Sequence, residues 1–115
     1  MNKAIIFLFF SSFAYAAISQ DIYDLSNSKK YALHLYKTKE YKRAAVEFER
    51  ICFLDSADWQ SKLLLLSSYR KDKNHYSSIS LYKNIESKVP YYKKHIFKTE
   101  YNKSLFNYDF KNFLN

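Results

Sequence analysis

The chain has 115 residues, a formal net charge of +8 and 20% aromatic residues, but no glycine and only one proline. Its length allows one small domain, near the lower limit for a chain that buries a self-sufficient core. The absence of glycine excludes glycine-rich phosphate-binding loops and disfavours sheets joined by tight turns, so the composition predicts an all-α fold.

Residues 1–19 have the composition of a secretory signal peptide, which would be removed from the mature protein. A charged Lys3 precedes an apolar run over residues 4–10, and small residues follow towards the end of the segment. Cleavage after Ala16 or after Ser19 fits the preference for small residues at such sites. An uncleaved anchor is the alternative, although the segment is shorter than the roughly 20 apolar residues of a spanning helix. We therefore expect export to the periplasm or cell envelope of a bacterium.

The mature domain, residues 20–115, carries a helical periodicity of apolar residues along most of its length. Tyr41, Ala44, Phe48 and Ile51 are spaced three, four and three residues apart, which places them on one face of a helix. The same periodicity, with the breaks between its segments, predicts helices over 22–38, 41–54, 59–72, 75–88 and 91–106 and a short helix from about 108. The single proline, Pro90, fits the first turn of the fifth helix.

The helical pattern repeats after 34 residues. A small residue recurs at Ala44 and Ser78, and an aromatic residue recurs at Phe48 and Tyr82. A repeat of this length is typical of stacked helical hairpins, none of which buries its apolar face alone. The period predicts repeats at about 25–58 and 59–92 and a partial repeat at 93–115.

The residues of the first repeat resemble those of the tetratricopeptide repeat family. The matching residues are Ala32, Leu35, Tyr36, Tyr41, Ala44, Phe48 and Asp55, whereas Lys39 and Ser56 replace the glycine and proline that are usual in the family. The resemblance implies a short solenoid of about two and a half repeats, built from antiparallel helical hairpins. It also implies a concave groove lined by the first helix of each repeat.

Eight residues are carried onto this groove by the resemblance: Lys29, Leu33, Tyr36, Lys37, Leu63, Ser67, Arg70 and Lys71. Cations interleaved with tyrosine and leucine suit an extended acidic peptide, because Lys and Arg pair with carboxylates. In the family's carboxylate clamp only Lys29 has a match, since Leu33 stands where an asparagine is needed. The alternative is that these lysines are merely solvated. If they serve only a ligand, Lys37→Glu and Arg70→Glu should weaken acidic partners and leave melting unchanged.

The partial third repeat ends in an aromatic segment that includes Phe106, Phe110 and Phe113. These residues are expected either to cap the open end of the stack or to contact another subunit, which includes self-association of the chain.

Catalytic chemistry has no recognisable arrangement in this sequence. His34, His75 and His95 lack metal-ligand spacing, and Cys52 is the single cysteine, so no intramolecular disulfide forms. Because Cys52 lies within an apolar helical pattern, we expect a buried, inert thiol. The chain is therefore predicted to be no enzyme and to bind neither metal nor cofactor.

The sequence favours a non-catalytic interaction or scaffold protein that binds a protein or peptide partner. Export disfavours nucleic acid as the partner of the basic chain. The alternative function is peripheral attachment to the membrane or envelope, because lysines alternate with Tyr and Phe in the C-terminal segment, as on helices that lie at membrane surfaces.

Overall fold

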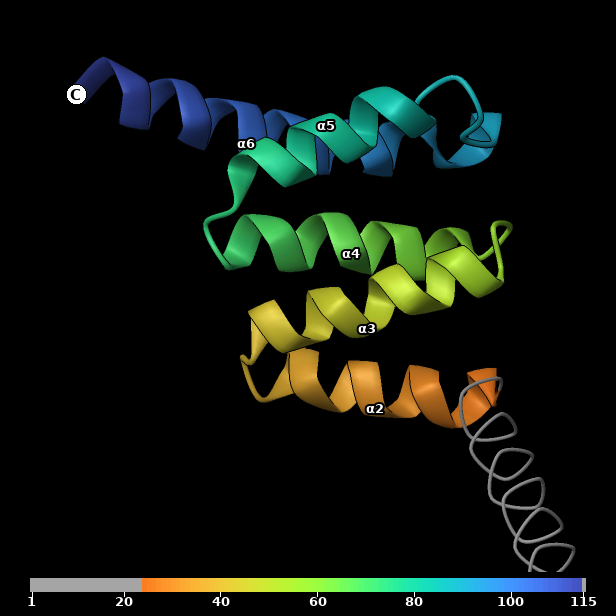
Figure 1. The fold of residues 1–115 in the computed structure, drawn as a ribbon. Helices are drawn as coiled ribbons and strands as arrows, with labels where there is room; N and C mark the ends of the chain where they lie inside the picture. The colour runs from red at the N-terminus through yellow and green to blue at the C-terminus, as the bar shows by residue number, and fades with distance from the viewer. Residues whose placement is uncertain (1–23, 115) are drawn as a thin grey trace, which may run out of the picture.

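The computed structural model describes the backbone of residues 24–114 and the side chains of residues 24–108. The described residues form five α-helices and one short 3-10 helix: α2 (Leu25–Lys37), α3 (Tyr41–Leu54), α4 (Trp59–Lys71), α5 (His75–Ile85), η1 (Tyr91–Lys93) and α6 (Lys94–Leu114). The predicted all-α class is confirmed. Figure 1 shows the α-helices stacked in chain order, with the direction of the chain alternating from one helix to the next. The predicted signal peptide lies outside the described residues.

Polar side chains fix where three of these helices begin. The Asp24 carboxylate accepts the backbone N–H of Asn27 at 3.2 Å, and the Asp58 carboxylate accepts that of Ser61 at 3.0 Å. In the same way Asn74 caps α5 by accepting the N–H of Ser77 at 3.3 Å. Such caps satisfy backbone donors that have no partner inside the helix. The cap at Asp24 makes α2 begin at Leu25, so the predicted start at residue 22 is wrong.

The two hairpins α2–α3 and α4–α5 repeat one another with the 34-residue period. The turn residues Lys39 and Lys73 have φ angles of 65° and 64°, in the left-handed region. In each turn the following residue donates its N–H back into the helix, from Glu40 to the Leu35 carbonyl at 2.9 Å and from Asn74 to the Tyr69 carbonyl at 2.8 Å. The lysines thus take the backbone conformation that glycine adopts at least cost.

Small and large residues alternate along the face of α3 that packs in the first hairpin. Ala44 and Ile51 are 0% exposed and Phe48 is 1% exposed, as the predicted helix face requires. This face of α3 packs in one cluster with residues of α2 and α4. The predicted bounds of α3, 41–54, are confirmed.

The second hairpin uses a polar contact where the first uses alanine. Ser78 is fully buried, donates to the Leu66 carbonyl at 3.2 Å, and shares a hydrogen bond of 2.8 Å with the hydroxyl of Ser104 in α6. The backbone of α5 can approach α4 and α6 closely because serine is small and its hydroxyl is satisfied at both contacts. α5 ends at Ile85, three residues before the predicted end.

The last helix differs most from the prediction. α6 runs from Lys94 to Leu114 without interruption, so the expected break before a short helix at about 108 is wrong. No glycine or proline lies in this stretch, and nothing in its backbone chemistry ends the helix there. Pro90 precedes the 3-10 turn instead of entering an α-helix, with φ −56° and ψ 142°.

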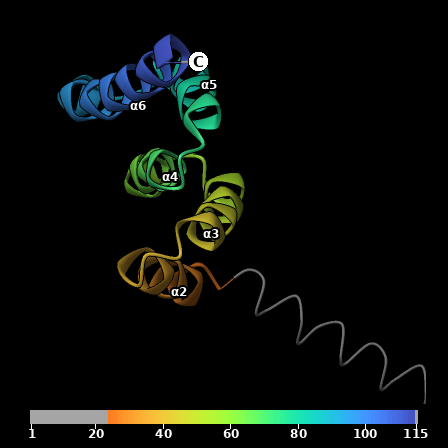
Figure 2. The same ribbon diagram turned by 90° about the vertical axis from the view of Figure 1, so that its left-hand side faces the viewer.

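The helices form two columns. Figure 2 shows α2, α4 and α6 on one side of the molecule and α3 and α5 on the other. Side-chain bonds join α2 to α4 and α4 to α6 within the first column. Three helices therefore contribute to one continuous surface, named here the α2–α4–α6 face.

Candidate interaction surface

All eight residues predicted to line a groove lie on α2 and α4, whose neighbour α6 extends the same face. Four of them are basic: Lys29, Lys37, Arg70 and Lys71. Their bonds within the chain determine which of these charges a ligand can meet.

Lys29 forms an ion pair with Asp58, the residue that caps α4. Its ammonium lies 2.7 Å from Asp58, whose side chain is 8% exposed. Burial favours the neutral form of Asp58, but the hydrogen bonds from Lys29 and from Ser61 outweigh burial and lower the pKa of this carboxyl. One carboxylate thus caps α4 and joins it to α2.

Arg70 is likewise paired inside the chain. Its Nε lies 2.9 Å from the Glu100 carboxylate of α6, and the two side chains are 18% and 15% exposed. Lys103 approaches the same carboxylate at 3.9 Å. The pair links α4 to α6 in a half-buried setting, where its charges are less screened than on an open surface.

Tyr36, at the centre of the α2–α4–α6 face, contacts residues of both α3 and α4. Its hydroxyl shares a hydrogen bond of 2.7 Å with Ser67, and its ring packs edge-on against Tyr41 with centroids 5.5 Å apart. The Lys71 ammonium lies 4.8 Å from the centre of the Tyr36 ring and 5.4 Å from that of Tyr41. A hydrogen bond with Tyr36 raises the pKa of Lys71, so this cation is both oriented and fully charged at neutral pH.

The remaining groove residues divide between the core and solvent. Leu33 and Leu63 are half-buried and pack against the two core clusters. Lys37 is exposed at the last residue of α2. Of the four predicted groove cations, Lys37 and Lys71 are exposed and have no ion pair among the described side chains, and they lie beside tyrosine and leucine residues.

The predicted repeat-end residues are only partly described. Phe106 is 70% exposed on α6, whereas the side chains of Phe110 and Phe113 lie outside the described residues. The backbone places all three on α6.

Cys52 is half-buried, whereas the sequence predicted a buried thiol. Burial raises its pKa to about 11, so it is protonated at neutral pH. Within residues 24–108, no cluster of three or more His, Cys, Asp or Glu side chains is arranged to hold a metal ion.

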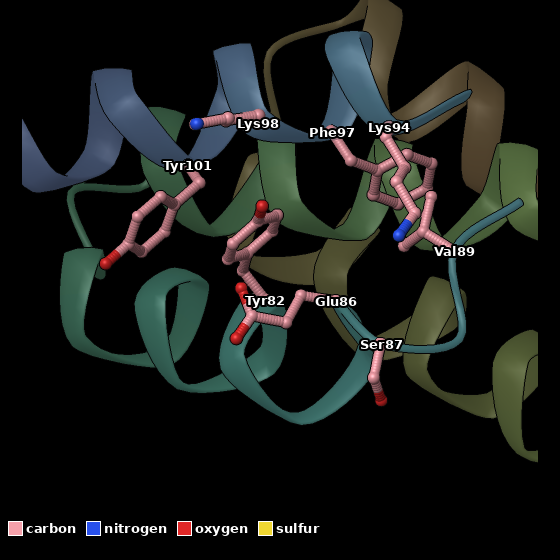
Figure 3. A pocket seen from close by; sticks show the side chains of 8 residues that line it. All are labelled: Tyr82, Glu86, Ser87, Val89, Lys94, Phe97, Lys98 and Tyr101. Carbon is pink, nitrogen blue, oxygen red and sulfur yellow. The ribbon is translucent and has the colours of Figure 1, made fainter. Parts of the chain in front are cut away.

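A cavity of about 500 Å³ between α5 and α6 was not predicted. Figure 3 shows its lining: Tyr82, Glu86, Ser87, Val89, Lys94, Phe97, Lys98 and Tyr101. The rings of Tyr82 and Tyr101 stack with centroids 4.3 Å apart. The aromatic periodicity of both segments was visible in the sequence, but the hollow depends on the angle at which the helices cross.

Comparison of the chain with protein-family models, with curated proteins and with solved structures gives no match. In the part of the chain that the structure describes, no helix combines the length and the apolar character needed to cross a membrane.

Proposed function

We propose that the chain is an exported, non-catalytic interaction module of the tetratricopeptide type, acting in the bacterial periplasm or cell envelope. The observation that carries the proposal is the structural repeat: the two helical hairpins share the aspartate cap of their first helix, the left-handed turn and the helix starts, each at a separation of 34 residues. Stacked hairpins of this length commonly present an extended surface to a partner.

The proposed partner is a protein or peptide with acidic groups, bound on the α2–α4–α6 face. Lys37 and Lys71 supply positive charge, and Lys71 is fixed above the Tyr36 ring. An ordered cation beside an aromatic surface favours a carboxylate attached to an apolar segment, because both parts of the ligand are contacted together.

Site-specific photo-crosslinking tests this face. A photoreactive phenylalanine analogue at Lys37 should give a discrete adduct in an extract of the native envelope, and added Lys71→Gln should reduce its yield. The matched control carries the analogue at Val46, which is 58% exposed on α3. Equal adducts from both positions, or none from position 37, would show that the α2–α4–α6 face is not the surface that binds the partner.

Export is tested separately by the mass of the secreted chain. Cleavage should leave a mature N-terminus at Gln20 or Ala17, as expected for the two sites. Recovery of the intact chain only in the cytoplasm would contradict export without bearing on the groove.

A second candidate, peripheral attachment to anionic membranes, has an observation of its own. Tyr91 and Tyr92 are 90% and 80% exposed, and they adjoin Ile96 at 50% and the lysines at 93 and 94. Exposed aromatic rings among cations suit an anionic lipid surface. Vesicle sedimentation that decreases with salt, and that is lost in Tyr91→Ser/Tyr92→Ser, would support this function over partner binding.

A further inference from the structure

The cavity between α5 and α6 combines an apolar floor with an aromatic wall. Val89 and Phe97, which are 4% and 1% exposed, belong to the second core cluster and form the floor. Tyr82 and Tyr101 stand beside them as a stacked pair. The volume of about 500 Å³ lies within the range of roughly 300–1,000 Å³ that is usual for small-molecule sites.

Two lysines at the edge of the cavity make it electropositive. Lys94 and Lys98 are one helical turn apart on α6, and neither has an ion pair among the described side chains. In Figure 3 the Lys94 chain points to the side of Val89 and the Lys98 chain to the side of Tyr101. Like charges four residues apart on a helix repel each other, so a bound anion would relieve that repulsion.

The only carboxylate in the described lining is Glu86, on the α5 side. With the two lysines it leaves a formal charge of +1 around the cavity. The cavity also borders the first turns of α6, where the helix dipole adds to the positive potential. One negative charge, directed to the α6 side and away from Glu86, is therefore the best complement.

We propose that this cavity binds an amphipathic monoanion: a small molecule with an aromatic or aliphatic body and a single carboxylate or sulfonate group. The body lies on Val89 and Phe97 beside the tyrosine pair, and the anionic group meets Lys94 or Lys98. This site is separate from the α2–α4–α6 face, and neither depends on the other.

The test uses the full chain and two related dyes. 8-Anilinonaphthalene-1-sulfonate carries one sulfonate on an aromatic body, and N-phenyl-1-naphthylamine has nearly the same body without the charge. Fluorescence titration should give saturable binding of one sulfonate dye per chain that dodecanoate displaces. Cooperative thermal melting of the same sample shows that the dye meets a folded protein.

Charge variants then locate the site. Lys94→Gln/Lys98→Gln should weaken the sulfonate dye roughly tenfold or more, the effect of losing a charge-assisted hydrogen bond, and leave the uncharged dye unaffected. Glu86→Gln should strengthen the sulfonate dye, because it removes a repulsive charge. The control Lys42→Gln/Lys73→Gln removes two exposed charges that do not line the cavity and should change neither dye.

Three outcomes would overturn the proposal. One is the same loss in the Lys94/Lys98 variant and in the Lys42/Lys73 control, which would mean general attraction to a basic surface. Another is absence of saturable binding to the folded chain. The third is unchanged dye binding together with a changed sedimentation coefficient in the Lys94/Lys98 variant, which would make this surface an interface between copies of the chain.

Discussion

Arg70 and Glu100 join α4 to α6 at 2.9 Å, and Tyr36, one repeat before Arg70, joins α2 to α4 through Ser67 at 2.7 Å. Tyr36 and Arg70 thus occupy the same position in successive repeats. Each contacts the next helix of the α2–α4–α6 face, Tyr36 through a hydrogen bond and Arg70 through an ion pair. The ion pair gives Arg70 a structural role between α4 and α6, in addition to the ligand contact predicted for it.

Arg70→Glu should lower the melting temperature, contrary to the expectation from sequence, because it sets two carboxylates against each other in a half-buried place. Arg70→Ala should cost about 1–3 kcal/mol of unfolding free energy, between the values for exposed and buried pairs. Thermal unfolding and urea unfolding, each followed by the fluorescence of Trp59, the single tryptophan, measure these two effects. Its ring packs against Phe97 of α6, so it reports on the α4–α6 contact. If Arg70→Glu is as stable as wild type, the Arg70–Glu100 pair contributes nothing to the free energy of unfolding.

The alternation of small and large residues in the first hairpin should make both kinds of substitution costly. Phe48→Ala leaves a cavity and should destabilise by about 3–5 kcal/mol, while Ala44→Leu overpacks the interface and should cost about 1–3 kcal/mol. Calorimetric melting measures each variant against Val46→Ala on the exposed side of the same helix. Melting like that of wild type in either core variant would refute the packing of α2 on α3.

The left-handed turns predict that glycine should stabilise the chain. Lys39→Gly and Lys73→Gly remove the cost of a side chain at φ near 65°, and each should gain up to about 1 kcal/mol after the greater freedom of glycine in the unfolded state is subtracted. Lys30→Gly, inside α2 at an exposed position, should instead lose about 1 kcal/mol. Thermal melting distinguishes the two expected gains of stability from the expected loss. A loss of stability at all three positions would contradict the left-handed conformation of the turns.

The half-buried Cys52 thiol predicts a loss of stability in alkaline solution. Cys52 has a pKa of about 11 in the folded chain against 9.0 for an unperturbed thiol. Below the lower value both states hold the proton. Between the two values the unfolded state releases it first, so the unfolding free energy decreases as the pH rises. Urea titrations at a series of pH values should show a shallower decrease in Cys52→Ala, and identical slopes would place the thiol in solvent.

Local chemistry explains which features were predictable. The spacing of Tyr41, Ala44 and Phe48 gave the bounds of α3, because one apolar face dominates that segment. The break expected at about residue 108 followed the repeat pattern, but no glycine or proline lies in residues 94–114 to end α6 there. Arg70–Glu100 and Lys29–Asp58 join residues about one repeat apart, so they follow from helix stacking and have no local signature. The cavity depends on the same tertiary geometry.

The order of the helices in space has a consequence for how the chain folds. Each helix packs mainly on the helix that follows it, across turns as short as Thr38–Glu40. Loop closure therefore costs little entropy at every step, and folds with such local contacts form on the order of microseconds to milliseconds. A chain emerging from the ribosome N-terminus first can bury Phe48 against α2 before the residues of α6 have been synthesised.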